Sequence, residues 1–132
     1  MARENRITLC LPGQADHSLV LRTMVGGVAY LYDLSVDDMD DLRAAADEAF
    51  DCLLHQGSTV ESITTDILRE DGRVSALLTA AFGEKQTSAP GEEENEISLA
   101  VLKTIMPDVQ LTVDGEGRIA AIRLTLSTGR AS

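Results

Sequence analysis

Two hairpin turns limit what this chain can fold into, because each of them joins a pair of antiparallel strands. The pair Asp71-Gly72 and the string Asp114-Gly115-Glu116-Gly117 both stand between runs of residues typical of strands, and Asp-Gly is a strong hairpin pattern. The predicted strand pairs are residues 59–68 with 73–82, and residues 109–113 with 118–126. Strands joined by such short turns favour an antiparallel sheet.

Helical periodicity occupies most of the chain outside these hairpins. Apolar residues recur at helical spacing in residues 16–32, 35–55 and 95–106, whereas residues 6–11 alternate in the manner of a strand. The order strand, two helices, two strands, helix, two strands predicts an α/β (α+β) fold. We expect a two-layer sandwich, with about five mostly antiparallel strands covered on one face by three helices. Residues 1–132 are predicted to form a single domain.

The first helix is predicted to begin at Asp16, which would be its N-cap, and to end near Tyr32. Its predicted apolar face consists of Leu19, Val20, Met24, Val28 and Leu31. Gly26-Gly27 lies inside this helix, where each glycine costs about 1 kcal/mol relative to alanine. We therefore expect either close helix packing or a local kink at this pair.

The second helix is predicted to have Ser35 as its N-cap, with Asp37 and Asp38 in a first turn where the helix dipole favours negative charge. Its predicted apolar stripe consists of Met39, Leu42, Ala46, Ala49, Phe50 and Leu53. Glu48 and Cys52 fall near the opposite side, with Asp41 and His55. We therefore expect Glu48 and Cys52 to share a face that the core does not claim.

Residues 83–94 are polar and contain Pro90-Gly91 and the run Glu92-Glu93-Glu94, so they are predicted to form a mobile, lid-like loop. Asn95 is the predicted N-cap of a helix that ends at Met106, before Pro107. The predicted apolar face of that helix consists of Ile97, Val101, Leu102 and Ile105.

The net charge of −11, from 22 acidic and 11 basic residues, limits the partners of this chain. Direct nucleic-acid binding needs a basic surface, and so does attraction to an anionic membrane. An acidic surface serves solubility, and it also suits a basic protein partner.

Cysteine and histidine usage points away from metal and disulfide chemistry. Cys10 and Cys52 lie far apart, with no Cys-x-x-Cys string, and His55 lacks other ligands at metal spacing apart from Glu48 and Asp51. We expect no metal site, no membrane span and a cytoplasmic location with free thiols.

Two strings resemble segments of a known family. The helix ending Asp47-Glu48-Ala49-Phe50-Asp51-Cys52-Leu53-Leu54-His55 looks like the Glu-Ala-x-x-Asn helix of the anti-sigma factor serine kinases, which have the GHKL (histidine-kinase and Hsp90-like) ATPase fold. The string Met106-Pro107-Asp108-Val109 is similar to the Met-x-acid-Val step by which the family's last helix enters the final hairpin. The resemblance covers nearly the whole chain and implies a GHKL-ATPase-like sandwich.

The resemblance also implies a particular site chemistry. In such a site a glutamate acts as base, and an asparagine one turn later helps to hold the Mg²⁺ that bridges the phosphates of ATP. A strand aspartate hydrogen-bonds adenine and is followed by glycines, and a second glycine-rich turn lets the last helix present its amides to phosphate.

Carried over position by position, few of these groups remain. Glu48 matches the base, but Cys52 replaces the asparagine, and a thiol is a poor ligand for Mg²⁺. Ala81 replaces the strand aspartate, and only Gly83 remains of the glycines that follow it. The resemblance therefore implies a degenerate ATP site.

The second glycine turn is replaced as well. It falls on Glu96-Ile97-Ser98, where Glu96 places negative charge near the expected phosphates and Ser98 replaces a glycine. We accordingly expect no cofactor, with ATP and Mg²⁺ bound only if the site is still active. The simpler alternatives are that Glu48 is a solvated helix carboxylate and that Cys52 is a small, partly buried apolar residue.

Three functions remain open from the sequence. By resemblance, the first is a regulatory protein that binds a sigma factor or an anti-anti-sigma protein. The second is an active serine kinase that uses Glu48 as base on a partner's serine. The third is a structural relic, alone or as a homodimer, with an unrelated ligand.

Overall fold

The computed structural model describes residues 6–86 and 92–128. These residues form the predicted order of elements, with a short 3₁₀ turn at Ala15–His17 before the first helix. The strands are β1 (Arg6–Pro12), β2 (Ser58–Glu70), β3 (Arg73–Gln86), β4 (Asp108–Val113) and β5 (Ile119–Ser127), and the helices are α1 (Ser18–Leu31), α2 (Val36–Leu54) and α3 (Glu92–Ile105).

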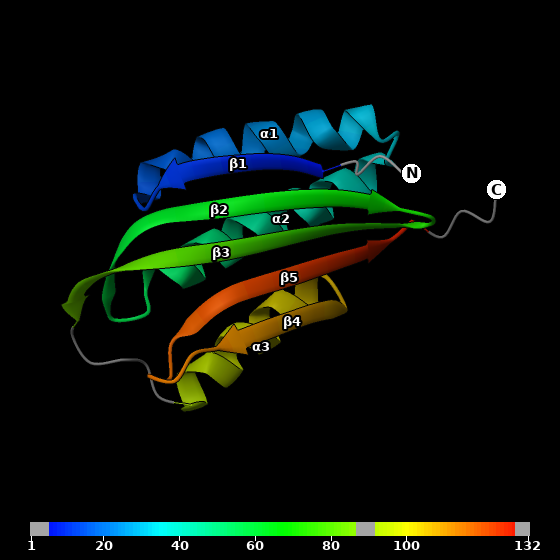
Figure 1. The fold of residues 1–132 in the computed structure, drawn as a ribbon. Helices are drawn as coiled ribbons and strands as arrows, with labels where there is room; N and C mark the ends of the chain where they lie inside the picture. The colour runs from blue at the N-terminus through cyan, green and yellow to red at the C-terminus, as the bar shows by residue number, and fades with distance from the viewer. Residues whose placement is uncertain (1–5, 87–91, 129–132) are drawn as a thin grey trace, which may run out of the picture.

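The five strands form one sheet in the order β1-β2-β3-β5-β4, and every neighbouring pair is antiparallel. The three helices cover one face of this sheet, so the molecule has two layers (Figure 1). The predicted fold class is therefore confirmed. Both hairpin turns are also confirmed, and Gly72 has the positive φ of 70° that a tight turn favours.

The core lies between the sheet and the helices. Along β2 and β3 every second side chain is buried, as in Ile63, Thr65 and Ile67, because successive side chains of a strand point to opposite faces. Helix α2 lies between α1 and α3 and packs on β2, β3 and β5. Its predicted apolar stripe is confirmed from Leu42 to Leu53, all of it buried.

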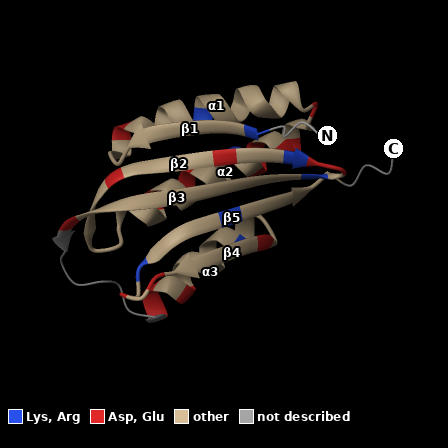
Figure 2. Cartoon of the chain, viewed as in Figure 1, with Lys and Arg blue, Asp and Glu red and all other residues tan. Residues whose placement is uncertain are grey.

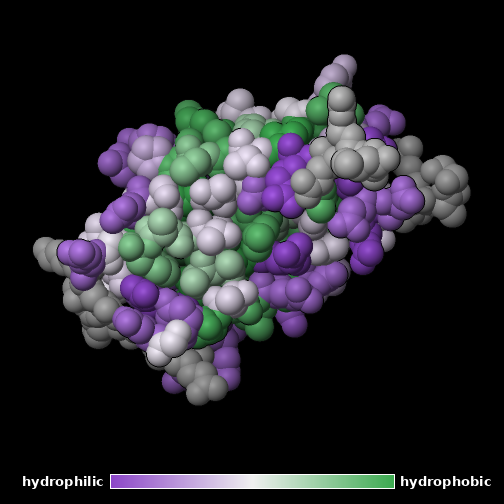
Figure 3. Space-filling view, in the orientation of Figure 1, coloured by the Kyte–Doolittle hydropathy of each residue, from purple (hydrophilic) through white to green (hydrophobic). Residues whose placement is uncertain are grey.

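The other face of the sheet carries small side chains. A row of paired residues crosses all five strands there: Cys10, Thr64, Thr79, Ala121 and Thr112. Figure 3 views this face and shows pale or weakly hydrophobic side chains over its middle, with hydrophilic ones around it. The sheet is thus apolar towards the helices and weakly polar on its outer face, as is common in antiparallel sheets.

One of the three predicted N-caps is confirmed. The Ser35 hydroxyl accepts a hydrogen bond from the Asp38 amide at 3.1 Å, which satisfies a free N–H group in the first turn of α2. The prediction for Asp16 is wrong, because the 3₁₀ turn takes up residues 15–17 and α1 begins at Ser18 without a side-chain cap.

The predicted apolar face of α1 is only partly confirmed. Val28 is buried and Met24 is partly buried against the core, but Leu19, Val20 and Leu31 are exposed. The other buried residues of the helix are Leu21, Val25 and Ala29. Only one of its 14 residues, Arg22, is charged. A helix that is apolar nearly all round gives no clear hydrophobic stripe, so periodicity could not select the face that packs.

Gly26-Gly27 shows neither of the expected features. Helix α1 runs unbroken through the pair. A Cβ atom on Gly26 would come no closer than 3.8 Å to the Arg43 side chain, and one on Gly27 would meet nothing within 4 Å. Within the described residues, therefore, no close packing accounts for Gly27.

The prediction for residues 83–94 is wrong at both ends. Strand β3 continues to Gln86, and α3 begins at Glu92, so Asn95 lies inside the helix rather than at its N-cap. Glutamates in a first turn are favoured by the helix dipole, which explains why the Glu92-Glu93-Glu94 run starts a helix. Residues 87–91, where a lid remains predicted, lie outside the described residues.

The predicted apolar face of α3 is only partly confirmed. Leu102 is buried and Ile105 is partly buried, but Ile97 and Val101 are exposed. Leu99 and Met106 pack on the core instead. Because α3 lies over β4 at one side of the sheet, only a narrow stripe of the helix reaches the core.

The turn after β1 yields a prediction about stability. A Cβ atom on Gly13 would lie 2.3 Å from the backbone oxygen of Val60. This clash could be relieved only by a movement of the backbone. We expect Gly13→Ala to lower the free energy of unfolding by about 1–3 kcal/mol, as overpacked substitutions do. Urea unfolding of the two proteins measures this difference.

The matched control is Gly115→Ala, at a glycine with nothing within 4 Å of its Cβ position. We expect it to change the free energy of unfolding by less than about 1 kcal/mol. Equal urea midpoints for the two variants would contradict the close approach of Gly13 to β2.

Candidate functional site

Cys52 lies near the C-terminal end of α2 and is a member of the hydrophobic core. Its exposed fraction is 8%, and it clusters with aliphatic residues of the sheet and of all three helices. The expectation that the core leaves this position free is therefore wrong. The helix buries a wider arc than its predicted stripe, because Ala45 and Cys52 are buried beside it.

The surroundings of the thiol favour its neutral form. Burial raises the pKa of Cys52 above its ordinary value, and the nearby carboxylates of Glu48 and Asp51 act in the same direction. Hydrogen bonds with Ser98 of α3 and with Gln56 act against this rise without cancelling it. The structure thus brings Glu48, Cys52 and Ser98 together where α2 meets α3.

Gln56, which the sequence analysis missed, ties this region to the sheet. Its side chain is buried, and its amide nitrogen donates to the Cys52 carbonyl at 3.0 Å and lies 3.7 Å from the Cys52 sulfur. Its amide oxygen accepts from the Ile119 N–H of β5 at 2.7 Å. One side chain therefore bonds a carbonyl in the last turn of α2, which also accepts from the His55 N–H, and an N–H at the start of β5.

Arg118, the residue before Ile119, fills the adjacent space. Its guanidinium lies 4.3 Å from the ring centre of Phe82 on β3, a cation–π contact. It also donates to the Ser58 hydroxyl at 3.0 Å and to the Asp114 carboxylate at 2.8 Å. These contacts join the ends of β2 and β3 to the turn between β4 and β5.

The turn itself is held by Asp114. Partial burial acts to raise the pKa of its carboxyl, but hydrogen bonds from the Glu116 and Arg118 amides and from the Arg118 guanidinium hold that pKa below its ordinary value. The Asn95 side chain of α3 donates to the Gly117 carbonyl at 3.1 Å. Helix α3 is thereby fixed against the same turn.

The structure does not bring Ala81 to the Glu48 and Cys52 group. Along β3 the residues Ala76, Leu78 and Ala80 face the helices, and Ala81 is exposed on the opposite face. Phe82 is the neighbouring residue that contacts Arg118. Alternation along the strand could have shown this, because Ala81 is an odd number of residues from Leu78.

Gly83 lies beside the start of β2. A Cβ atom there would approach the Thr59 side chain to 3.3 Å, so glycine permits the two strands to come close. The β2–β3 pairing is irregular in this region, between Ser58 and Ser62. The close approach of β3 to Thr59 therefore accounts for a glycine at position 83.

Glu48 lies on α2 one turn before Cys52 and is partly buried. Figure 2 shows acidic residues along α2 and at the start of α3.

His55 contacts Asp51 at the end of the same helix, through the Asp51 carbonyl at 2.7 Å and its carboxylate at 3.5 Å. Across residues 6–86 and 92–128, no three His, Cys, Asp or Glu side chains are placed to hold a metal ion.

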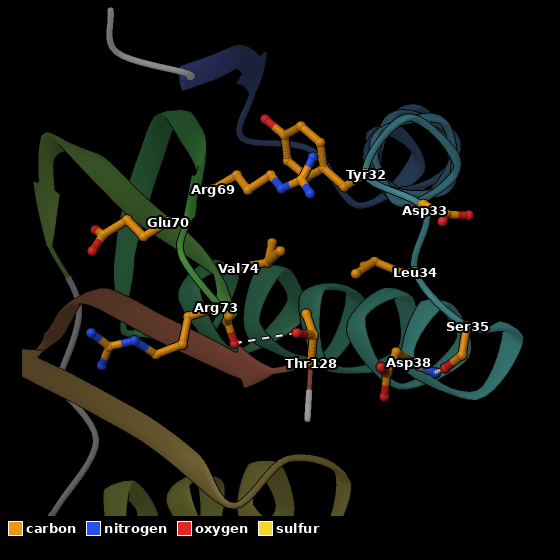
Figure 4. Close-up of a pocket in the computed structure, with 11 residues that line it drawn as sticks. Tyr32, Asp33, Leu34, Ser35, Asp38, Arg69, Glu70, Arg73, Val74 and Thr128 are labelled. Carbon is orange, nitrogen blue, oxygen red and sulfur yellow. Dashed lines mark hydrogen bonds between the residues drawn. The ribbon is translucent and has the colours of Figure 1, made fainter. Parts of the chain in front are cut away.

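A cavity of about 240 Å³ lies at the other end of α2, where the helix begins. Figure 4 shows Ser35, Asp38 and Leu34 on one side of it and Val74 and Thr128 on another. The Arg69 guanidinium lies over the Tyr32 ring at 5.4 Å. This cavity is distant from Cys52 and shares none of the residues predicted for the site.

Within the described part of the chain, no helix is both long enough and apolar enough to cross a membrane.

No protein-family model matches the sequence. The chain is similar to proteins described as "Serine-protein kinase RsbW" from Bacillus mycoides strain KBAB4 and from Bacillus cereus strains G9842 and B4264. Each is 26% identical over 130 residues, covering 86% of this chain and 81% of the relative.

The buried thiol predicts a difference between the two cysteines. Cys10 is exposed and Cys52 is buried, so a thiol reagent should modify Cys10 quickly and Cys52 only after unfolding. Ellman's reagent, added to native protein and then with urea, measures this difference. Equal rates for both thiols in native protein would contradict the burial of Cys52.

The raised pKa of Cys52 predicts a pH dependence of stability. The unfolded chain releases the thiol proton near the ordinary pKa of 9.0, whereas the folded chain retains it to higher pH. The free energy of unfolding should therefore fall as the pH rises above that value. Urea unfolding of wild type and Cys52→Ala over this range should show a steeper fall in wild type, and identical slopes would contradict the assignment.

Proposed function

We propose that this chain, a distant homologue of the serine-protein kinase RsbW, is a regulatory protein of the anti-sigma factor type. In this proposal it binds a sigma factor or an anti-anti-sigma protein through its surface, and its ATP site is degenerate. Residues 1–132 act as one domain in the cytoplasm. The function is thus binding rather than phosphate transfer.

The burial of Cys52 is the observation that carries the proposal. In the family that the chain resembles, an asparagine at this position helps to hold Mg²⁺. Here the side chain is 8% exposed, carries a thiol that burial keeps neutral, and contacts Ser98 and Gln56. A neutral, buried thiol does not fit a hard cation that prefers oxygen ligands.

The other end of the expected nucleotide site supports the same conclusion. Ala81 points away from the helices and has no group that could hydrogen-bond adenine. On the other face of the strand, Phe82 and Arg118 lie against each other, and Arg118 is held by Ser58 and Asp114. Glu96 adds negative charge to α3, where phosphates would need N–H groups and positive charge.

The charge of the surface supports a basic partner. The chain has a net charge of −11, and the acidic residues of α2 and α3 lie on the helix layer (Figure 2). Such a surface attracts the basic, nucleic-acid-binding regions of a sigma factor and speeds the encounter. This attraction weakens as salt shortens the Debye length, which is about 8 Å at physiological ionic strength.

An active kinase is the second candidate, because Glu48 is partly exposed next to the α2–α3 contact. A carboxylate in this place could accept the proton of a partner's serine hydroxyl. The two candidates differ in what Glu48→Ala does, since docking does not need a base.

We expect Glu48→Ala to bind the partner within about twofold of wild type, since one surface charge on a helix contributes little affinity. The matched control is Asp40→Ala, an exposed acid on the same helix. Both variants and wild type are titrated calorimetrically with the purified sigma factor and anti-anti-sigma protein of the same host. In a separate kinetic measurement, the rate constant of association should fall as the salt concentration is raised.

The same proteins, incubated with Mg-ATP, give the opposing test. We expect that wild type, Glu48→Ala and Asp40→Ala all fail to transfer phosphate to a serine of the partner. Transfer by wild type and Asp40→Ala that is lost in Glu48→Ala would establish the kinase instead. Failure of both partners to bind at low salt would overturn the docking proposal.

A further inference from the structure

The outer face of the sheet has a hollow of about 210 Å³ at the end nearest the turn between β2 and β3. Its floor consists of two small residues that pair across β3 and β5, Ser75 and Thr125. Longer side chains at the neighbouring positions of the same face surround them. The hollow is therefore on the opposite side of the sheet from the helices that carry Glu48 and Cys52.

Two arginines line this hollow from opposite ends. Arg73 is two residues from Ser75 on β3, towards the turn, and Arg123 is two residues from Thr125 on β5, in the other direction. The two positions are thus four residues apart along the strands, or about 13 Å. Two arginine side chains that reach towards each other nearly close such a gap, so one bound molecule can contact both guanidinium groups.

Among the described residues, neither guanidinium has a partner. Arg73 stands directly opposite Glu70 in the β2–β3 pairing, but the two form no ion pair. Figure 4 shows both side chains pointing away from the cavity at the start of α2, without contact between them. Arg123 also lacks an ion pair within the described part of the chain, whereas Arg118 has three partners there.

Hydrogen-bond donors line the middle of the hollow. The Ser75 and Thr125 hydroxyls lie on its floor, and Gln110 of β4 adds an amide. The two acids of the lining, Glu70 and Asp108, are on the outer strands β2 and β4 of the four, and their charge balances that of the two arginines. In a chain of net charge −11, this neutral region repels an anion less than the molecule as a whole does.

Two separate guanidinium groups favour a ligand with two separate carboxylates. Each guanidinium presents its N–H groups as a planar fork that matches one carboxylate. Because the forks come from opposite ends, each can bind one end of a short dicarboxylate, whose methylene groups then lie against the half-buried Leu68 beside the floor. A single phosphate concentrates its charge at one point and would engage both arginines only if both bent towards that point.

We propose that this hollow binds a short dicarboxylate of four or five carbon atoms, with one carboxylate at Arg73 and the other at Arg123. The bound molecule accepts hydrogen bonds from the hydroxyls of Ser75 and Thr125 and joins β3 to β5 on the open face of the sheet. This site is independent of the proposed docking of a protein partner and of the nucleotide region.

Succinate and glutarate test the site in the full chain. Each is titrated into isotope-labelled protein at constant ionic strength, and the backbone amide and arginine Nε–H signals are followed by NMR. We expect saturable shifts at Ser75, Thr125 and the Nε–H groups of Arg73 and Arg123, with a dissociation constant on the order of 1 mM. Succinamate, which has the length of succinate but an amide in place of one carboxylate, should bind about tenfold more weakly or worse.

Arg73→Gln and Arg123→Gln locate the site, with Arg43→Gln as the matched control. All three changes remove one positive charge from an exposed arginine, and Arg43 lies on α2 in the helix layer. Each of the first two variants should raise the dissociation constant for succinate about tenfold or more, whereas Arg43→Gln should change it less than about twofold. Urea unfolding of each variant checks that it is folded.

The absence of saturable shifts at Ser75 and Thr125, with either dicarboxylate well above millimolar concentration, would overturn the proposal. So would an equal loss of affinity in all three variants, because that result would reveal a general effect of charge. Tighter binding of acetate or inorganic phosphate than of both dicarboxylates would assign the hollow to another kind of anion. Wild type alone gives the first and third of these results, so the proposal can fail even where a variant does not fold.

Discussion

The packing of α2 on the centre of the sheet is the interaction on which the rest of this structure depends. Helix α2 lies between α1 and α3 and contacts three of the five strands, so it connects the two layers. Alanines at positions 45, 46 and 49 let it approach the sheet closely, and Phe50 and Leu53 fill the space beside them. Side-chain changes on this face are constrained by close packing.

That packing also decides what position 52 contributes. Because the arc of α2 that faces the core includes Cys52, the side chain there serves as a small apolar group next to Ser98 and Gln56. Gln56 then links the same turn to β5 through Ile119, and the neighbouring Arg118 reaches Phe82. This end of the molecule is therefore held together by its own side chains.

Patterns set by local physics could be predicted from the sequence. The Asp71-Gly72 turn, the Ser35 cap and the α2 stripe depend on neighbouring residues, and all three are as predicted. Helix α1 is apolar around most of its circumference, so its buried face is decided by tertiary contacts alone. For the site, Cys52 and Ser98 do meet, and alternation along β3 could have given the face on which Ala81 lies. The role of Gln56 could not be predicted, because it depends on how α2 is placed against β5.

Calorimetric titration of the chain with Mg-ATP tests the central claim most directly, namely that position 52 packs the core instead of holding a cation. The account predicts no measurable heat of binding up to millimolar nucleotide, where a free energy of binding of about −4 kcal/mol would already be detected. A dissociation constant in the micromolar range, dependent on Mg²⁺, would contradict it.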